Sequence, residues 1–425
     1  MSELEQRISI DQVRVGLYIR LEEWMDHPFL FNSFKIRNEK QLHTLRALGI
    51  QHVIYVREKS DLPPLPPARM DAPPPPPAQE PDPEMAAMWQ AKKERREKLT
   101  RQREALGRCE KKFNTGVGTV KSMLRNLFSR PAESIAQAQA LVTDMVDSLL
   151  DEKDVVLHLM NAKMGDENAY YHALNVTMLA LILGKEAEFS PEEMHSLGMG
   201  TLLHDMGKEK VPSQILLKKS PWTNAERNFY QQHVLYGVEM ARPLPEMTAG
   251  ALEVIAMHHE LLDGTGFPGK LKGDRVGRFA RIACIANTFD NYCNRANLAD
   301  SMTPAEAISH MFRRENGKYD PVLMQHFIRS MGVYPPGSVV QLNDGTVGLV
   351  MSVNPGKLLH PSLLIYDPDV PKEEAIWLDL SEDPDLSVEK TLRPRELSKE
   401  VFDYLEPRSR VSYYSESNAS ARRTQ

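Results

Sequence analysis

The sequence predicts a mainly α protein, in which a helical domain stands between a small α/β module and a small β-rich extension. Between residues 131 and 332, apolar residues recur at helical spacing in segments such as "HALNVTMLALILGKEA" and "GRFARIACIANTFDNY". Residues 8–57 begin with the alternating pattern of a strand, "RISIDQVRVGLYIRL". The segment "SVVQLNDGTVGLVMSV" has the pattern of a β-hairpin with Asp344 and Gly345 in the turn.

The composition is that of a globular protein with two or three domains. The chain has 425 residues, 41% of them hydrophobic, and a formal net charge of -6. This balance gives no broad basic field, which excludes a nucleic acid polymer as a partner. The three cysteines form no CxxC pair, no apolar run is long enough to span a bilayer, and the start "MSELEQRISI" lacks the pattern of a signal peptide. We therefore expect a cytoplasmic protein.

Three parts are expected before the helical domain. Residues 1–60 form a small α/β module, because the helical pattern "NEKQLHTLRALGI" leads into the strand pattern "HVIYV". Residues 61–83 hold eleven prolines, which favour an extended linker. Residues 84–130 are rich in helix formers with opposite charges three and four residues apart, which predicts a solvated connector helix or a short coiled coil.

Residues 131–332 form the predicted all-α domain, whose helices carry start and stop signals. Ser190 and Thr303 each precede a proline and acidic residues, so both are expected to be N-caps. Gly207 suits a helix C-terminus.

Residues 333–408 form the β-rich extension, in which "SLLIYD" is a further strand candidate, and residues 409–425 are predicted to be a disordered tail. This extension could serve as a lid, a dimer surface or a stabilising flap. The N-terminal module carries no obvious catalytic set, and we assign it a role in interaction or regulation.

The helical domain also carries the chemistry, because seven of the thirteen histidines lie between residues 158 and 259. Helical bundles build metal centres from side chains on successive helices. One ordered set fits this pattern: His172, His204, Asp205, His233, His258 and His259. A carboxylate beside a histidine can bridge two cations, and adjacent histidines on a helix diverge by about 100°, so the last two can reach two metals, or one metal and its neighbouring water. The other histidines are expected at the surface or in ordinary core positions: His158, His195, His310 and His326.

Three segments together resemble the HD-GYP proteins, a branch of the HD metal-dependent phosphohydrolases. "LLHDMGKEKVPSQIL" is similar to their HD segment, "QQHVLYG" to the segment of their next histidine, and "HHELLDGTGFPGKLKG" to their signature loop. The resemblance covers residues 165–330. Residues 8–57 resemble the small module that often precedes such domains in bacterial proteins.

The resemblance implies an all-α HD-type fold that holds two divalent cations, iron or manganese, with zinc, nickel or cobalt as alternatives. It also implies hydrolysis of the bacterial second messenger cyclic di-GMP to linear pGpG, GMP or both. Two such ions about 3.5–4 Å apart can hold a bridging hydroxide and stabilise both oxygens of a phosphodiester displacement. The implied ligands are His172, His204, Asp205, His233, His258, His259 and Asn287. Asp205 and Lys208 are the implied catalytic residues, and the implied substrate contacts are Lys208, Gly266, Phe267, Pro268 and Arg295.

The chain departs from the family pattern at several positions. Phe267 replaces a tyrosine, and Asn287 stands where the family has an aspartate ligand, with Asp290 matching a second acid one turn later. Asn168 stands where members with three metals have a glutamate, with Glu167 one step out of phase, so we expect two metals. The arginine-rich segment that usually follows is reduced to Arg295.

Two functional hypotheses remain open. The first is a cyclic di-GMP phosphodiesterase, based on the intact histidines, Asp205 and Lys208. The second is a catalytically weakened sensor or scaffold that binds cyclic di-GMP or docks onto an enzyme that makes it, based on Asn287 and Phe267. Hydrolysis of another phosphoester is a weaker third, since the fold alone does not set the substrate. A homodimer is left open.

Overall fold

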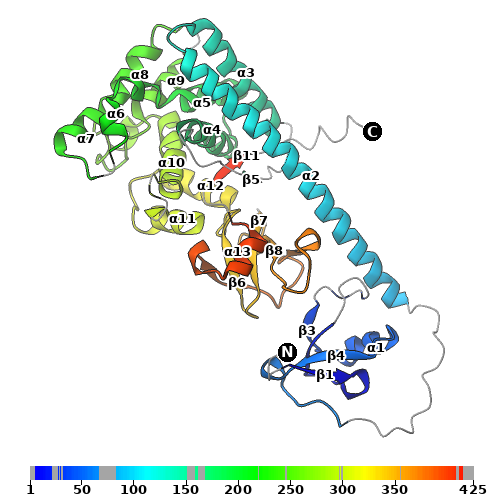
Figure 1. Cartoon of the computed structure of the whole chain (residues 1–425). Coiled ribbons are helices and arrows are strands. Elements are labelled where there is room, and N and C mark those ends of the chain that lie inside the picture. The colour runs from blue at the N-terminus through cyan, green and yellow to red at the C-terminus, as the bar shows by residue number, and fades with distance from the viewer. Residues whose placement is uncertain are drawn as a thin grey trace. The chain divides into compact units, whose positions relative to one another are not determined.

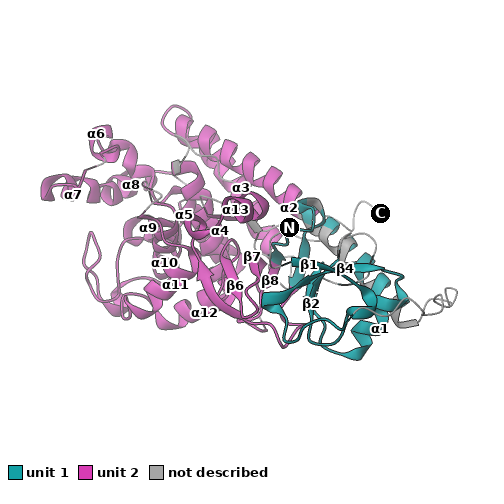
Figure 2. Ribbon diagram, turned by 60° about the horizontal axis from the view of Figure 1, so that its bottom comes forward, with its two compact units in different colours: residues 1–103, 364–378 teal, residues 104–363, 379–425 magenta. Residues whose placement is uncertain are grey.

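The computed structural model of the chain divides into two compact units, which Figure 2 shows in separate colours. One comprises residues 1–103 and 364–378, and the other comprises residues 104–363 and 379–425. The structure describes residues 5–21, 27, 29, 32–66, 83–150, 158–160, 168–218, 220–244, 247–295, 297, 300–354, 356–407 and 411–414. Most of the predicted proline-rich linker, residues 67–82, lies outside them. Among the described helices, none is both long and apolar enough to cross a bilayer.

The N-terminal module contains an antiparallel four-stranded sheet in the order β1-β4-β2-β3 and one helix. Its elements are β1 (Glu5–Ser9), β2 (Tyr18–Arg20), β3 (Ser33–Lys35), α1 (Glu39–Ala47) and β4 (His52–Val56). Asn38 caps α1, because its side chain accepts the N–H of Gln41. The predicted helix and final strand are confirmed. The short strand β3 was not predicted, because three residues are too few to show an alternating pattern.

The charged stretch after the linker forms α2 (Pro83–Asn126). The sequence predicted a solvated connector, and that is wrong for the second half of the helix. Cys109, Phe113, Val120 and Met123 are fully buried in the core of the helical domain. Apolar residues recur there every three or four positions, so one face of the helix packs inward while the charges cover the other.

The helical domain is arranged around α4 (Asn168–Glu186), which Figure 1 shows among the neighbouring helices α3, α5 and α10. The remaining helices are α3 (Pro131–Leu150), α5 (Pro191–Leu203), α6 (Ser213–Leu216), α7 (Asn224–Gln231), α8 (His233–Ala241), α9 (Ala249–Met257), α10 (Arg278–Cys293), α11 (Pro304–Arg313) and α12 (Pro321–Met331). The predicted N-caps are confirmed, because Ser190 and Thr303 accept the N–H groups of Glu193 and Glu306.

Short 3-10 helices occur in the N-terminal module, in the helical domain and in the β-rich extension. They are η1 (Ile10–Gln12), η3 (Arg57–Lys59), η4 (Met206–Lys210), η5 (Gly273–Arg275), η7 (Lys372–Glu374) and η8 (Pro394–Glu396). Gly207 lies inside η4 and does not end a helix, contrary to expectation. A Cβ at Gly207 would lie 1.9 Å from the carbonyl oxygen of His233, so glycine is needed there for close packing against α8.

The β-rich extension contains a sheet in the order β10-β6-β7-β8-β9 and the helix α13 (Lys399–Leu405). Its strands are β6 (Val339–Leu342), β7 (Val347–Ser352), β8 (Ser362–Ile365), β9 (Ile376–Asp379) and β10 (Val388–Leu392). The predicted hairpin is confirmed as β6 and β7, with Gly345 at a φ of 87° in the turn.

One strand pair was not predicted. Within the expected disordered tail, β11 (Ser412–Tyr414) pairs antiparallel with β5 (His158–Met160), which lies inside the expected all-α domain. Tyr413 and Tyr414 are buried in the core of the helical domain. Each strand has three residues, so neither shows a pattern in the sequence. Residues 408–410 and 415–425 lie outside the described part of the chain.

Candidate metal centre

Asp205 occupies the junction between α5 and η4, where the HD segment leaves its helix. α5 starts at the capping box of Ser190 and Glu193 and ends at Leu203, so His204 is the C-cap and Asp205 follows it. A Cβ at Gly200 would lie 2.9 Å from the carbonyl oxygen of Ala251, so this glycine lets α5 and α9 approach closely. The close approach brings the end of α5 near the end of α9, where His258 lies.

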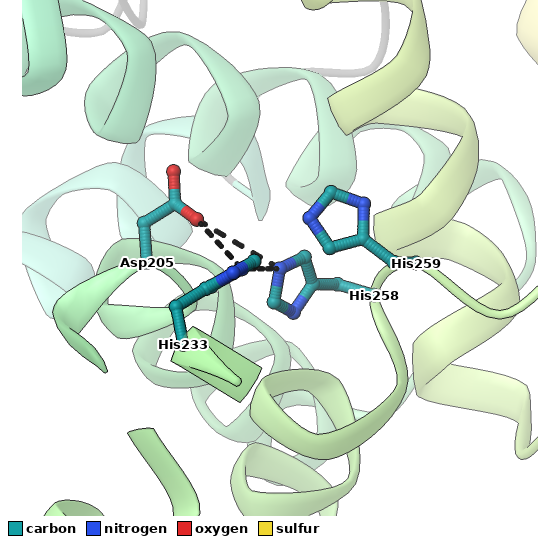
Figure 3. Close-up of side chains that lie close together, drawn as sticks. All are labelled: Asp205, His233, His258 and His259. Atoms are coloured by element: carbon teal, nitrogen blue, oxygen red, sulfur yellow. Dashed lines mark hydrogen bonds and ion pairs between the residues drawn. The ribbon is translucent and has the colours of Figure 1, made fainter. Parts of the chain in front are cut away.

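The predicted histidines and Asp205 gather into two groups. One consists of His172, His204 and Asp205, and the other of Asp205, His233, His258 and His259; in each group the possible ligand atoms lie within 4.8 Å of one another. Figure 3 shows the second group, whose four side chains face one space. Asp205 is common to both, so the structure gives this carboxylate the shared position.

The two oxygens of Asp205 face different groups. Oδ2 lies 3.5 Å from His172 Nε2 and 3.4 Å from His204 Nε2. Oδ1 lies 3.5 Å from His233 Nε2 and 3.8 Å from His258 Nε2. A carboxylate placed in this way can bridge two cations.

The hydrogen bonds of the histidines fix which ring nitrogen carries the proton. His204 Nδ1 lies 2.6 Å from the carbonyl oxygen of Thr201, and His233 Nδ1 lies 2.7 Å from that of Tyr230. His258 Nδ1 lies 3.1 Å from the carbonyl oxygen of Ile255. Because a carbonyl only accepts, each Nδ1 donates, and in the neutral ring Nε2 keeps a free lone pair.

These lone pairs converge in a way that fits metal ions. His172 Nε2 and His204 Nε2 lie 3.2 Å apart, and His233 Nε2 and His258 Nε2 lie 3.3 Å apart. Two acceptors cannot hydrogen-bond to each other, whereas a cation between them satisfies both. Asp205 Oδ1 and His259 Nε2 are buried and have no hydrogen-bond partner among the described residues. The donor set therefore fits divalent cations.

Burial keeps the second group in the state that binds metals. It lowers the pKa of His233, and it lowers the pKa values of His258 and His259 well below the usual value, which favours neutral rings. Burial alone would raise the pKa of Asp205, but the charge of Lys208 and the contact with His204 outweigh it and hold that pKa well below its usual range. The centre thus combines neutral imidazoles with an ionised carboxylate.

Lys208 points its charge at the centre. Its Nζ lies 2.5 Å from Asp205 Oδ2 and 5.5 Å from the centre of the Tyr230 ring. Burial opposes this charge, but Asp205 outweighs that effect and raises the pKa of Lys208. The lysine is therefore positively charged beside the shared carboxylate.

His258 and His259 do not diverge as helix geometry suggested. α9 ends at Met257, so the angle of about 100° between neighbouring helical residues does not apply to them. Their ring centroids lie 4.2 Å apart, and both fall in the group that contains His233.

The signature loop supports His259 by folding back on its own backbone. A Cβ at Gly266 would lie 2.5 Å from the carbonyl oxygen of His259, so this glycine serves a close backbone approach within the loop. Phe267 precedes a cis Pro268 and stacks on the His259 ring, with centroids 4.3 Å apart. Glu260 is buried and accepts the backbone N–H groups of Gly269 and Leu271. Sequence reasoning missed this anchor.

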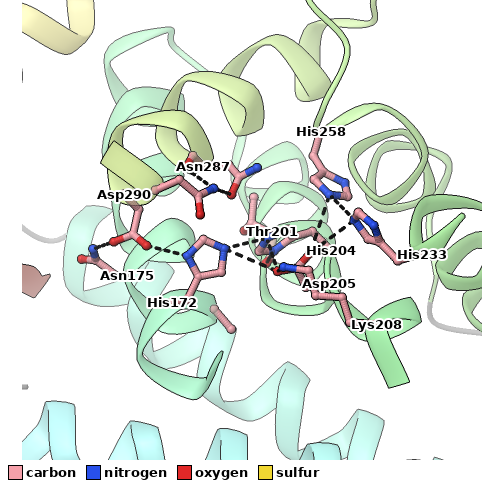
Figure 4. A network of polar contacts seen from close by, with 12 residues as sticks. His172, Asn175, Thr201, His204, Asp205, Lys208, His233, His258, Asn287 and Asp290 are labelled. Atoms are coloured by element: carbon pink, nitrogen blue, oxygen red, sulfur yellow. Dashed lines mark hydrogen bonds and ion pairs between the residues drawn. The ribbon is translucent and has the colours of Figure 1, made fainter. Parts of the chain in front are cut away.

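Asp290 and Asn287 lie on α10, beside the first group (Figure 4). Asp290 Oδ2 accepts the Nδ1 proton of His172 at 2.5 Å, so this acid orients a histidine. The side-chain oxygen of Asn287 accepts a hydrogen bond from Asn291 at 2.8 Å. The side chains of Glu167 and Asn168 are outside the described part of the structure.

A cavity of about 410 Å³ opens beside the centre. It is lined by His259, Asn287, Thr288, Asn291, Tyr292, Asn294 and Arg295. The structure thus brings Arg295 into one pocket with two of the predicted ligands. Gly266, Phe267 and Pro268, which were predicted to contact the substrate, are not among the described residues that line this cavity.

The other histidines that we considered do not join either group. His195 Nδ1 lies 2.7 Å from the carbonyl oxygen of Pro191, and the His310 ring packs edge-on against Tyr292. His326 is in neither group, and the side chain of His158 lies outside the described residues.

Comparison with known proteins gives matches along most of the chain. A family described as an HD domain matches residues 132–323, and a domain of unknown function, DUF3391, matches residues 5–138. The cyclic di-GMP phosphodiesterase PA4108 of Pseudomonas aeruginosa is 28% identical over 85% of this chain and 85% of its own length. The 3'3'-cGAMP-specific phosphodiesterase 2 of Vibrio cholerae is 29% identical over 43% of this chain and 35% of its own length.

Among solved structures, a HDG"Y"P protein from Bdellovibrio bacteriovorus is 14% identical, covers 76% of this chain and 98% of its own, and has a TM-score of 0.43. That score is too low to carry an argument about this protein. The match to the HD domain agrees with the site, because the matched residues include every histidine of both groups. Residues 132–323 of this chain are thus similar to HD domains, and residues 5–138 are similar to the DUF3391 domain.

Proposed function

We propose that this chain is a metal-dependent phosphodiesterase that hydrolyses cyclic di-GMP to linear pGpG, to GMP, or to both. The position of Asp205 carries the proposal, because its two oxygens face two histidine groups. Sites with two neighbouring cations are typical of enzymes that cleave phosphodiesters. The substrate is supported by the Pseudomonas aeruginosa relative, which is named a cyclic di-GMP phosphodiesterase and matches along 85% of this chain.

The two groups would each hold one cation, with Asp205 shared and Asn287 as a further ligand of the first. Imidazole-rich sets suit iron and manganese, which we propose, and also zinc, nickel or cobalt. When bound, such cations supply Lewis-acid activation of the phosphodiester and of water at neutral pH.

Lys208 and the pocket would bind and orient the substrate. The Lys208 charge lies beside the shared carboxylate, where it can neutralise charge that develops on a phosphate oxygen. Arg295 lines the adjoining cavity, and a guanidinium can hold a phosphate through two parallel hydrogen bonds. The amide oxygen of Asn291 can accept a hydrogen bond from a guanine edge, because its Nδ2 group already donates to Asn287. Phe267 would act indirectly, by holding the His259 ring.

The test is turnover of cyclic di-GMP by protein reconstituted with Fe(II) or Mn(II) without oxygen. We expect linear product from the wild type and none from His204→Ala, with circular dichroism largely unchanged. The same assay with 3'3'-cGAMP separates the two substrates named for the relatives. Equal turnover by wild type and His204→Ala would refute a metal-dependent reaction.

The alternative is a binding protein that has lost turnover. Asn287 favours it, because an amide brings no negative charge to the centre and its oxygen already accepts a bond from Asn291. Tight binding of cyclic di-GMP without product, together with turnover by Asn287→Asp alone, would establish that alternative.

A further inference from the structure

The strand β11 is connected to the metal centre through hydrogen bonds, although in sequence it lies well after residues 132–323, which match the HD domain. All of its residues are buried, and one edge pairs with β5. The hydroxyl of Tyr413 donates to the carbonyl oxygen of Pro336, and Phe113 of α2 packs edge-on against Tyr414. The strand is therefore held firmly from several sides.

Two asparagine side chains occupy the other edge of the strand. The N–H of Val411 donates to Asn294 Oδ1 at 2.9 Å, and the N–H of Tyr413 donates to Asn175 Oδ1 at 2.7 Å. Residues two apart in a strand present their N–H groups on the same edge. The carbonyl oxygen of Val411 accepts the amide groups of both asparagines, at 2.7 Å from Asn294 and 3.3 Å from Asn175.

These contacts decide which end of each amide faces Asp290. Only the amide oxygen can accept a peptide N–H, so each amide nitrogen is turned away from that donor. The Nδ2 groups of Asn175 and Asn294 both donate to Asp290 Oδ1, the latter at 2.7 Å. The second oxygen of Asp290 remains free to accept the Nδ1 proton of His172. Figure 4 shows part of this chain of contacts, from Asn175 through Asp290 to His172.

His172 differs in this respect from the other oriented histidines. His204, His233 and His258 donate Nδ1 to backbone carbonyls three residues earlier. His172 instead depends on a side chain that two asparagines and a distant strand hold in place. Loss of the strand would therefore affect one group and spare the other.

We propose that β11 is a positioning element of the metal centre: through Asn175 and Asn294 it holds Asp290 against His172 and so supports the cation of the group formed by His172, His204 and Asp205. This inference rests on the proposed metal centre. Residues that orient a ligand in this way typically change metal affinity about 10- to 100-fold when they are removed.

The experiment measures Mn(II) binding to full-length variants by equilibrium dialysis with metal analysis. We expect the wild type to bind two cations. In the single variant Asn294→Ala, and in the double variant Asn175→Ala/Asn294→Ala, we expect one cation to bind about 10- to 100-fold more weakly and the other to bind with unchanged affinity. Tyr413→Phe is the matched control, because it removes only the bond to Pro336 and keeps the backbone contacts of the strand. His172→Ala identifies the affected cation.

Each outcome bears on the proposal. Unchanged affinities in both asparagine variants would overturn it, and so would equal weakening of both cations with a lower melting temperature, which indicates a merely structural role. Asn294 is only partly buried, so Asn294→Ala decides the question if the double variant does not fold. If the wild type binds no cation, the proposed metal centre is refuted as well. If the wild type binds two cations and hydrolyses cyclic di-GMP, and the asparagine variants bind both cations with unchanged affinity, only the role of β11 is refuted and the proposed function stands.

Discussion

The two groups of the candidate metal centre share Asp205 but are supported in different ways. His233 and His258 are oriented by carbonyl oxygens of neighbouring backbone, and His259 is stacked under Phe267 of the loop that follows it. His172 is oriented by Asp290, which depends in turn on residues near the C-terminal end. The first kind of support is local in sequence, and the second is assembled from three distant segments.

This difference shows that a sequence motif can contain the ligands of a site without the residues that orient them. A segment such as "HHELLDGTGFPG" contains both the ligands and the loop that holds them. The HD segment contains His204 and Asp205, but the partners that complete its group come from α4, α10 and β11. A relative could therefore keep every motif and still lose one cation.

The largest effect is expected for Asp205→Asn, which removes the shared charge from both groups. Loss of one electrostatic contact in an active site typically lowers turnover about 10²- to 10³-fold, and here two cations lose a ligand, so we expect at least that loss. Metal analysis should show both cations weakened. Glu209→Gln, an exposed neighbour, serves as the control. Full retention of one cation would mean that the carboxylate is not shared.

Lys208→Met should reduce turnover about 10²-fold while both cations stay bound, since the lysine contacts Asp205 but offers no lone pair when charged. Lys210→Met is the matched control, because that lysine is exposed and pairs with Glu239. Steady-state kinetics beside metal analysis separates the two effects. Loss of a cation in Lys208→Met would assign the lysine to the support of the centre.

Gly207→Ala should disturb the group of His233 through packing. The added methyl would meet the carbonyl oxygen of His233, and overpacking of this kind costs about 1–3 kcal/mol in the free energy of unfolding. Gly118→Ala on α2 is the control, since nothing lies within 4 Å of its Cβ position. Denaturant unfolding of both variants checks the difference. Equal stabilities would contradict the described contact between η4 and α8.

Asn287→Asp should have the smallest effect on metal binding, in the opposite direction. A carboxylate in place of the amide adds a negative charge beside the His172 group, and we expect tighter binding of that cation by about tenfold, or about 1.4 kcal/mol. Asn224→Asp, at an exposed position that begins α7, is the control. If neither cation changes in calorimetric titration, Asn287 is not a ligand.

Sequence reasoning identified the fold class, the order of the helices and the residues that gather around Asp205. Hydrophobic periodicity and capping signals are local, and so they survive in a single sequence. The buried half of α2, the strand pair of β5 and β11, and the asparagine contacts of Asp290 were missed. The strand pair and the asparagine contacts depend on residues that meet only after folding, and short strands leave no periodic signal. The second half of α2 does have apolar residues at helical spacing, but they stand among many charged residues. The orientation of His258 and His259 was misjudged because α9 ends at Met257, before both histidines.

The most direct test of the shared carboxylate is anomalous diffraction from crystals of the full chain reconstituted with Mn(II). We predict two anomalous peaks, one beside each oxygen of Asp205, with His172 and His204 around one and His233, His258 and His259 around the other. A single peak, or two peaks of which only one contacts Asp205, would contradict the account.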